Sequence, residues 1–559
     1  MIPPAVSSGI DWSAGSYEEI SRRHRWDIPE RFNVGVLACD WYADGSRRLA
    51  LVCTRGDAPP GRGDCYTFDD LKDLSDRLMT VLAEMGVERG DRVAVYLPQR
   101  VETAVAHLAA IKLGAVSVPL SPLFRADALE YRLRHSGAKV LVTDEEHYDH
   151  VAEIRARLPS TLQVISCDDG TPGCEAFWRM VRGAYPCARR ARTSKDDPAM
   201  LVYTSGTSGM PRGALHAHRF LPGRLSGFEL VHRLEAAPSA DRPFWTPSDW
   251  AWIGGLVDCV LTPWVFGCPV LAHRRQGFDP ESVLSLIARE RVRSLFLAPT
   301  AIQRLRTIDA DHAPSGLQVQ SVHTAGEPLS PEAYAWAAAT FGTVFELYGL
   351  TEMGATIGNS PFCEVRPGSM GKPYPGHEVA ILDEAGAPVR AGEIGEIAIR
   401  RGDPGMFLGY LDDPAATAAR FRGDYLVTGD LARRDRDGYI WYQGRADDVF
   451  NTSGYRVGPT EIEASLATHP AVQHAAVVGS PDPERGAIVK AFVVLRQGFT
   501  PSPALAAEIQ THVKSRLAAY EYPRRIVFAR ELPMTASGKI RRGELRALDA
   551  DARYGLATR

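Results

Sequence analysis

Short apolar runs alternate with longer stretches of mixed polarity through much of the chain. Their length and their content of β-branched residues predict buried strands. Such runs occupy residues 92–97, 115–119, 139–143, 199–203, 292–297 and 344–347. Residues 101–113 repeat apolar side chains at helical spacing, which predicts an amphipathic helix. Strands that alternate with helices indicate parallel sheets, so we expect an α/β fold.

The pattern changes twice towards the C-terminus. Between residues 378 and 400, shorter strands with turn residues predict a small antiparallel, barrel-like section. After a polar joint, further helices and strands are expected at residues 459–467, 474–479, 487–495 and 503–517. We therefore predict a large body of doubly wound α/β subdomains that includes the barrel-like β section (1–443), a hinge (444–448) and a small mobile α+β domain (449–559).

The composition is typical of a globular enzyme. The chain has 559 residues, more than one core usually supports, and its net charge of -4 gives no electrostatic reason to bind nucleic acid. The nine cysteines include no Cys-x-x-Cys pair, which predicts neither a zinc site nor a disulfide framework. The N-terminus lacks the features of a signal peptide, and Asp258 and Pro263 interrupt the most apolar stretch, 250–271. We expect a cytoplasmic protein without a membrane span.

A loop rich in glycine and hydroxyl residues follows the run at 199–203. Gly206, Gly209 and Gly213 allow tight turns that present backbone N–H groups to an anion. Hydroxyl donors are supplied by Thr204, Ser205, Thr207 and Ser208. This chemistry suits a nucleoside triphosphate, but no Gly-Lys-Ser/Thr follows at the spacing of the usual NTPase loop. Taken alone, the segment has a second reading as a surface linker, and the nucleotide reading is the favoured one.

Six further segments, in the same order along the chain, resemble the signatures of adenylate-forming enzymes. They are residues 325–330, 346–352, 392–396, 428–430, 444–448 and 534–539. With the glycine-rich loop, they resemble a superfamily that contains acyl-CoA synthetases, luciferases and peptide-synthetase adenylation domains. Residues 444–459, 480–486 and 520–524 most closely resemble the medium-chain acyl-CoA synthetases.

The resemblance implies a reaction in two halves. A carboxylate attacks the α-phosphate of ATP to give an acyl-adenylate and pyrophosphate, and the thiol of CoA then displaces AMP. The implied partners are a small carboxylic acid, ATP, Mg²⁺ and CoA. Backbone N–H groups, a magnesium ion and fixed cations are suited to neutralise the crowded phosphates of the first half.

The resemblance also implies a nucleotide site. Tyr348 would stack on adenine, and Asp430 would accept hydrogen bonds from the ribose hydroxyls, with Arg445 on the other side of the ribose. The structural alternative for Tyr348 is an aromatic side chain of the core, and for Asp430 it is an Asx turn. The residues implied to bind ATP or AMP are Thr204, Ser205, Gly206, Thr207, Ser208, Gly209, Arg212, Gly326, Glu327, Pro328, Glu346, Leu347, Tyr348, Gly349, Leu350, Asp430 and Arg445.

Three residues are implied to take part in the chemistry. Glu352 would hold Mg²⁺, which prefers hard oxygen ligands, and Thr351 would offer its hydroxyl to a phosphate. Lys539 would be the catalytic cation of adenylation. Because only eight of the 64 basic residues are lysines, a lysine at this motif position is unlike the arginines of an ordinary basic tail. Arg212 stands where family loops carry lysine, which either the arginine bias or a retuned loop would explain.

The CoA half-reaction is implied to use the C-terminal domain. The domain would rotate at Asp447, so that Lys539 moves out and the turn at Gly454 moves beside the pantetheine channel. Solvated surface arginines are the alternative for the cationic residues of this group. The residues implied to contact CoA are Ser453, Gly454, Tyr455, Arg456, Arg485, Ser515, Tyr520, Tyr522 and Arg524.

Residues 248–255 match the region that shapes the acyl pocket in relatives. Trp250, Trp252 and Gly254 are expected to line an apolar slot, and core packing is the alternative for both tryptophans. Acetate-specific relatives place a bulky tryptophan where this chain has Gly349, so we expect acids longer than acetate: short to medium, branched or small aromatic. Alternative functions are loading of a carrier-protein pantetheine, a luciferase-like oxygenase and a silent nucleotide-binding regulator.

Overall fold

The structure is a computed structural model in which two compact units are distinguished. It describes residues 7–55, 64–187, 191–204, 211–232, 242–274, 277–308, 314, 317–446, 448, 450–452, 455–482, 486–517, 521–534 and 540–550. The first unit comprises Met1–Thr204, Pro211–Glu378 and Arg401–Ala419, and the second comprises mainly Val379–Arg400 and Arg420–Arg559. The predicted boundary at 444–448 stays a prediction.

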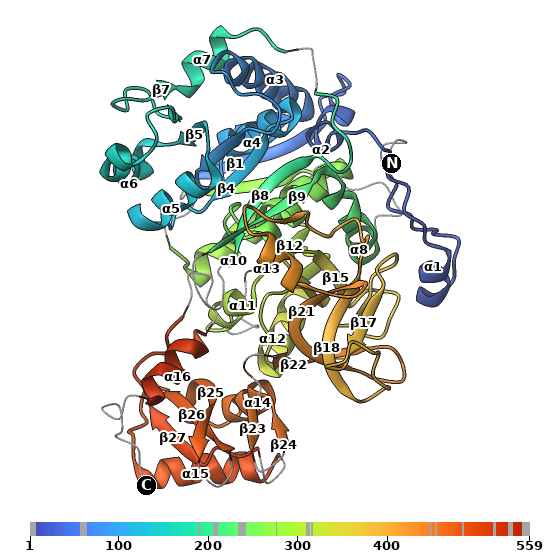
Figure 1. The fold of residues 1–559 in the computed structure, drawn as a ribbon, viewed down its shortest axis with the longest axis vertical. Coiled ribbons are helices and arrows are strands. Elements are labelled where there is room, and N and C mark those ends of the chain that lie inside the picture. Colours follow the sequence, from blue (N-terminus) through green and yellow to red (C-terminus); the bar gives the residue numbers. More distant parts are fainter. Residues whose placement is uncertain are drawn as a thin grey trace. The chain divides into compact units, whose positions relative to one another are not determined.

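Two large, mainly parallel sheets form the first unit (Figure 1). The eight-stranded sheet has the order β19-β9-β8-β4-β3-β5-β6-β7. Its strands are β3 (Arg92–Tyr96), β4 (Val116–Leu120), β5 (Val140–Thr143), β6 (Gln163–Ser166), β7 (Glu175–Ala176), β8 (Pro198–Thr204), β9 (Arg212–Ala217) and β19 (Gly409–Tyr410). The strand predictions in this region are confirmed, and β8 and β9 add an antiparallel pair.

The nine-stranded sheet has the order β16-β15-β14-β13-β12-β10-β11-β1-β2. Its strands are β1 (Leu49–Arg55), β2 (Asp64–Thr67), β10 (Phe244–Trp245), β11 (Val270–Arg274), β12 (Ser294–Phe296), β13 (Ser321–Thr324), β14 (Val344–Leu350), β15 (Gly354–Gly358) and β16 (Lys372–Pro373). Six neighbouring strands, in the order β14-β13-β12-β10-β11-β1, pair in parallel. Strand β2 at one edge and strands β15 and β16 at the other edge join antiparallel.

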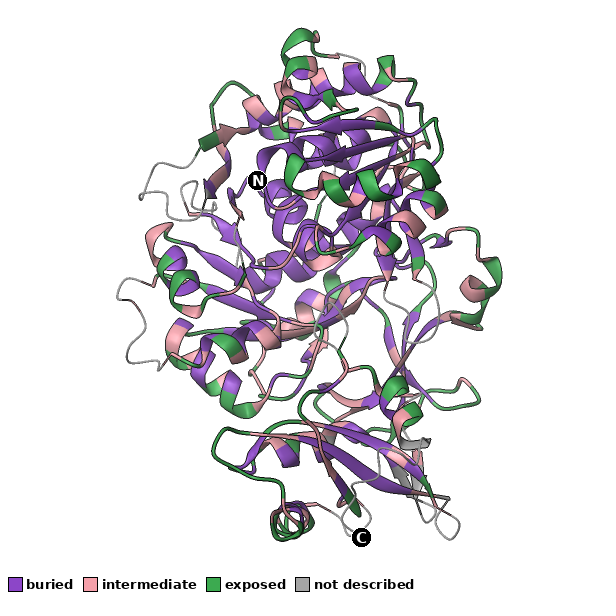
Figure 2. Cartoon of the chain, turned by 90° about the vertical axis from the view of Figure 1, so that its left-hand side faces the viewer, coloured by how far each residue is buried: buried purple, intermediate pink, exposed green. Residues whose placement is uncertain are grey.

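Helices connect and cover these strands. They are α1 (Tyr17–Arg23), α2 (Val34–Ala38), η1 (Asp40–Tyr42), α3 (Phe68–Glu84), α4 (Val101–Leu113), α5 (Ala126–Ser136), α6 (Glu145–Ile154), η2 (Arg155–Arg157), α7 (Phe177–Gly183), η3 (His218–Phe220), α8 (Pro222–His232), η4 (Gly254–Leu261), α9 (Thr262–Val265), α10 (Pro280–Arg289), α11 (Pro299–Leu305), α12 (Pro331–Phe341) and α13 (Pro414–Ala419). Buried residues fill the strands and the helix faces that cover them (Figure 2).

Helix α4 begins and ends where the sequence predicts, but the prediction of an amphipathic helix is wrong. Its residues from Val101 to Lys112 are all buried, in a core that includes side chains from both sheets. Its polar residues are paired: Glu102 accepts two hydrogen bonds from Arg100, and the Lys112 ammonium donates to Ser75 at 2.8 Å. The polar positions resembled a solvent-facing stripe because sequence spacing does not reveal such partners.

The second unit contains two small sheets and a two-stranded ribbon. The antiparallel strands predicted at 378–400 are confirmed as β17 (Val379–Leu382) and β18 (Ile394–Arg400). Beyond the predicted range, β20 (Phe421–Arg422), β21 (Tyr425–Arg434) and β22 (Ile440–Arg445) complete this five-stranded sheet. The remaining elements are β23 (Phe450–Thr452), β24 (Tyr455–Val457), α14 (Pro459–Ala467), β25 (Val472–Asp482), β26 (Gly486–Leu495), α15 (Pro503–Lys514), β27 (Arg525–Phe528) and α16 (Arg542–Ala550). No helix within the described ranges is long and apolar enough to cross a membrane.

Buried histidines make the stability of the fold sensitive to acid. Burial lowers their pKa values from about 6.5 to about 4 for His24 and His218, and to about 3 for His107, His216 and His323. Below pH 6.5 the unfolded chain therefore binds protons that the folded chain does not. The stabilisation is complete above this pH and decreases as the pH falls towards 4.

We expect the thermal denaturation midpoint to fall steadily between pH 6.5 and 4. Each such histidine contributes a slope of about 1.4 kcal/mol per pH unit in the free energy of unfolding. Calorimetric scans across this range check the prediction. Repeating them at high salt, which screens surface ion pairs, serves as the control. A midpoint that is constant from pH 7 to pH 5 would contradict it.

Candidate functional site: groups for nucleotide, acid and thiol

The ends of the predicted phosphate loop are held by an antiparallel pair. Thr204 at the end of β8 pairs with Arg212 at the start of β9, and the Thr204 hydroxyl donates to the Arg212 carbonyl at 3.5 Å. Residues 205–209, which carry the predicted loop chemistry, lie outside the described residues. Arg212 is exposed at the mouth of this hairpin, as a phosphate ligand would have to be.

Tyr410 joins two of the predicted site residues. Its ring lies under the Arg212 guanidinium, 5.6 Å from the centroid, and its hydroxyl donates to Glu352 Oε1 at 2.5 Å. Arg212 Nε also lies 3.3 Å from Asp413 Oδ2. Arg212 and Glu352 are thus brought together although 140 residues separate them. Sequence reasoning missed Tyr410, because no motif marks the two-residue strand β19.

The predicted adenine segments also meet. Glu346 on β14 accepts a hydrogen bond from the Gly368 N–H at 3.0 Å and interacts with the backbone of Leu329, which directly follows the segment Gly326, Glu327 and Pro328. Burial raises the pKa of Glu346 to about 7. Leu347, Tyr348 and Leu350 follow on the same strand, and Tyr348 is buried.

The predicted ribose residues are paired in the second unit. Asp430 on β21 lies opposite Arg445 on β22, and Arg445 Nη1 donates to Asp430 Oδ1 at 3.2 Å. The turn before Asp430 is fixed because the Gly429 N–H donates to Glu396 Oε1 at 2.7 Å. Gly429 has a φ of +75°, and a Cβ there would lie 2.8 Å from Arg445. Only glycine leaves the arginine in place.

The residues around Glu352 suit a magnesium ion. Glu352 is 8% exposed and offers hard carboxylate oxygen, and Thr351 directly precedes it in the sequence. No group of three acidic, histidine or cysteine ligands occurs among the described residues. An ion held there would take its other ligands from substrate phosphates and water, which is typical of magnesium.

Only part of the predicted CoA set is described. Asp447, Ser453, Gly454, Arg485, Tyr520 and Lys539 lie outside the described residues, and Tyr455 and Arg456 lie on β24. The others are neighbours: Tyr522 lies beneath the Arg524 guanidinium at 5.1 Å and beneath the Lys514 ammonium at 5.4 Å, and Ser515 follows Lys514. Lys514 adds a cation that the sequence did not single out.

The predicted acyl residues have different surroundings. Trp250 is 2% exposed and belongs to the core, whereas Trp252 is half-buried and packs edge-on against Phe124. A Cβ on Gly254 would contact the Phe296 ring at 3.4 Å. A Cβ on Gly349 would lie 2.3 Å from the Gly354 carbonyl oxygen, so the β14–β15 hairpin itself requires glycine there. His218 has a structural contact, because its Nδ1 accepts from the Val34 N–H at 3.2 Å.

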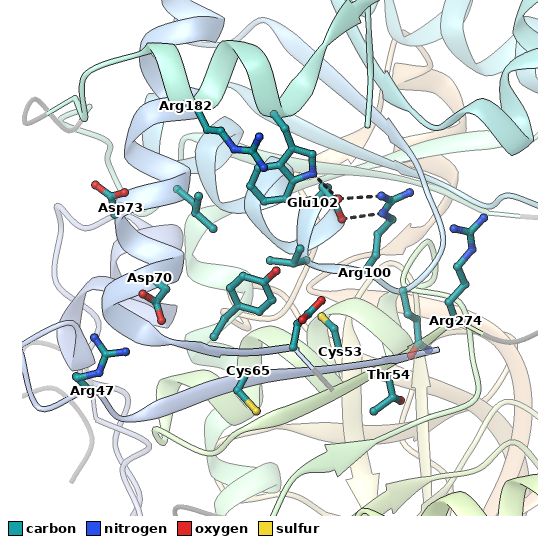
Figure 3. A pocket seen from close by; sticks show the side chains of 16 residues that line it. Arg47, Cys53, Thr54, Cys65, Asp70, Asp73, Arg100, Glu102, Arg182 and Arg274 are labelled. Atoms are coloured by element: carbon teal, nitrogen blue, oxygen red, sulfur yellow. Dashed lines mark hydrogen bonds and ion pairs between the residues drawn. The ribbon is translucent and has the colours of Figure 1, made fainter. Parts of the chain in front are cut away.

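A separate cavity of about 780 Å³ contains none of the predicted site residues. Arg100 and Glu102 line it and face each other across two hydrogen bonds, and Arg47 and Arg274 lie on opposite sides of the view (Figure 3). Arg100 also donates to Asp144 at 3.3 Å. The Arg100 guanidinium in the lining of this cavity is thus already paired with two carboxylates.

Comparison with known proteins identifies the family of the chain. The family model described as "AMP-binding enzyme" matches residues 41–411, and "AMP-binding enzyme C-terminal domain" matches residues 461–539. An acetyl-coenzyme A synthetase of Bacillus subtilis (strain 168) is 35% identical, covering 99% of this chain and 98% of the relative. The mitochondrial acyl-coenzyme A synthetase ACSM4 of Rattus norvegicus is 37% identical over 97% of this chain and 94% of its own.

Solved structures show the same fold. An acyl-CoA synthetase of Brucella canis is 36% identical, with a TM-score of 0.71 over 94% of this chain and 96% of its own. The anthranilate CoA ligase AuaEII in complex with anthranoyl-AMP is 31% identical, with a TM-score of 0.83 over 94% of this chain and 98% of its own. The chain therefore belongs to the AMP-binding enzyme family of the adenylate-forming superfamily, as an acyl-CoA synthetase of the AMP-forming acid–thiol ligases.

Proposed function

We propose that this enzyme joins a short-to-medium, branched or small aromatic carboxylic acid to free CoA through an acyl-adenylate. The contact of Arg212 and Glu352 through Tyr410 is the observation that carries the proposal. It gathers a cation and a carboxylate beside the loop that would hold the triphosphate. A cytoplasmic location and use of Mg²⁺ are part of the same proposal.

In the first half-reaction the chain has to bind ATP and neutralise charge. Arg212 grips a β- or γ-phosphate oxygen, and Tyr410 and Asp413 fix the direction of its guanidinium. Glu352 would hold Mg²⁺, which supplies Lewis-acid stabilisation of the phosphate oxygens when bound. Asp430 and Arg445 orient the ribose. Lys539 meets the negative charge that develops at the α-phosphate as the acid carboxylate attacks.

In the second half-reaction the CoA thiolate attacks the acyl carbon, the carbon–oxygen bond to the phosphate breaks, and AMP leaves with the electron pair. Lys514, Tyr522 and Arg524 present a basic and aromatic surface that suits the phosphates and adenine of CoA. The acyl-coenzyme A synthetase names of the relatives also support free CoA, since they name the coenzyme.

The direct test measures AMP and thioester together. Purified enzyme is given ATP, Mg²⁺, CoA and a panel of straight, branched and aromatic acids from acetate to dodecanoate. We expect equal amounts of AMP and acyl-CoA, with kcat/KM highest for an acid longer than acetate. AMP release that requires a phosphopantetheinylated carrier protein instead of CoA would favour the carrier-loading alternative. Nucleotide binding without AMP formation would contradict the proposal.

Replacement of Lys539 tests its assigned role. We expect Lys539→Ala to lower acid-dependent ATP–pyrophosphate exchange roughly 100-fold or more, as loss of one preorganised donor does elsewhere. Thioester formation from preformed acyl-adenylate and CoA should persist. Lys195→Ala, which removes an exposed ion pair with Glu30, is the matched control and should keep the wild-type exchange rate. Equal loss of both half-reactions would show that Lys539 is not specific to adenylation.

The pKa of Glu346 predicts a pH dependence of ATP binding. Above about pH 7 its carboxylate can accept a hydrogen bond from the adenine amino group, and below that pH it is increasingly protonated. We expect the KM for ATP to fall between pH 6 and 8 in the wild type and to vary much less in Glu346→Gln. The exposed Glu332→Gln is the control. Parallel pH profiles for wild type and Glu346→Gln would contradict the prediction.

The two pocket glycines should respond differently to an added methyl group. Gly349→Ala places a Cβ against hairpin backbone and should lower the free energy of unfolding by about 1–3 kcal/mol. Gly254→Ala makes an ordinary contact with Phe296, so its stability should stay near the wild type while its preference moves to smaller acids. Denaturant unfolding and the acid panel measure both. Equal destabilisation of the two variants would contradict this assignment.

A further inference from the structure

Arg224 is a buried cation with unmet hydrogen bonds. It lies on α8, is 4% exposed, and its Nε, Nη1 and Nη2 atoms have no hydrogen-bond partner among the described residues. The charged group beside it is Asp258, whose Oδ1 lies 3.5 Å from Nη1, too far for a good hydrogen bond. Burying a guanidinium without acceptors is costly, so this site calls for a ligand or water that can accept.

Asp258 is the partly exposed member of this ion pair. It lies on η4, a π-helix, a rare form that is frequent at functional sites. Its side chain is 26% accessible, yet burial raises its pKa, with the nearby Arg224 acting in the opposite direction. The Asp258 carboxylate is therefore partly accessible and lies beside a cation whose donors have no hydrogen-bond partner among the described residues.

The ion pair touches both elements that carry the proposed acyl-pocket glycines. Gly254 lies four residues before Asp258, which places the two on neighbouring positions of one π-helix face. Gly354, whose carbonyl packs against Gly349, has a φ of +75°, and a Cβ there would lie 1.9 Å from Arg224 Nη1. Arg224 and Asp258 therefore lie beside the two elements that carry the proposed acyl-pocket glycines.

The ligand has to satisfy both members of the pair. A hydroxyl accepts from the arginine and donates to the aspartate. A methyl group would leave both unsatisfied, and a second carboxylate would be repelled by Asp258. We propose that the acid substrate carries a hydroxyl on its acyl chain, which accepts a hydrogen bond from Arg224 and donates one to Asp258. This inference rests on the proposed function and names the substrate class of the same site.

The test compares acids of equal chain length in the AMP-release assay. The panel contains plain acids, their hydroxylated forms with the hydroxyl at successive carbons, and the corresponding dicarboxylic acids. We expect one hydroxylated acid to exceed its plain counterpart roughly 10- to 100-fold in kcat/KM, as a hydrogen bond to charged groups implies. Sites built to bind a hydroxyl discriminate strongly against the analogue that lacks it.

A double variant tests the residues themselves. Arg224→Met with Asp258→Leu removes both charges, so neither is left buried alone, a replacement that folds in comparable cases. The ratio of kcat/KM for hydroxylated over plain acid should fall at least tenfold. The control is the same double replacement at the half-buried pair of Arg77 and Asp73, 2.7 Å apart on α3, which should keep the wild-type ratio.

Each outcome decides the proposal. A wild-type enzyme that uses plain acids as well as hydroxylated ones, or prefers dicarboxylic acids, overturns the hydroxy-acid inference and leaves the proposed function intact. A hydroxyl preference that survives in the Arg224→Met/Asp258→Leu variant overturns the assigned residues. Absence of AMP release with every acid overturns the proposed function and this inference with it.

Discussion

Charge buried inside the first unit is the constraint on which much of its structure depends. Helix α4 lies in a core that includes side chains from both large sheets, so its charged residues cannot reach water. Lys112 is 0% exposed and lies near Asp40 and Asp76, while Glu102 is clamped by Arg100 and by the Trp178 indole N–H. Removing one partner would leave an uncompensated charge, which is far more costly than losing a surface ion pair.

Against this background Arg224 stands out because its donors are not met by neighbouring side chains. Elsewhere in the described unit the buried guanidinium of Arg100 has a full set of acceptors. Buried charges in this unit are thus of two kinds. Those such as Arg100 are paired within the protein, whereas Arg224 has the donors that we propose a ligand to use. The cavity of Figure 3 belongs to the first kind, because Arg100 in its lining is bonded to Glu102. The pair of Arg224 and Asp258 belongs to the second.

Much of the fold could be predicted from the sequence, because buried strands and capped helices leave local patterns. The bounds of α4 and α14 and the positions of β3, β5 and β8 were within reach of periodicity. The residues proposed to bind the nucleotide were assigned from contiguous motifs. Tyr410 and Asp258 could not be found in this way, because their roles arise from contacts across more than 30 residues of chain. The complete burial of α4 and the π-helical winding of η4 depend on tertiary packing and leave no local signal.

The contacts of Arg212 with Tyr410 and Asp413 have a consequence for chimaeric enzymes made by exchanging loops between relatives. The Arg212 guanidinium lies over the Tyr410 ring while its Nε lies 3.3 Å from Asp413 Oδ2, whereas the lysine that family loops usually carry offers one compact charge. The glycine-rich loop and the distant segment around β19 therefore form a matched set. A chimaera that imports the loop of a lysine-bearing homologue alone would inherit the glycines but lose this fit, so the loop is not a modular part.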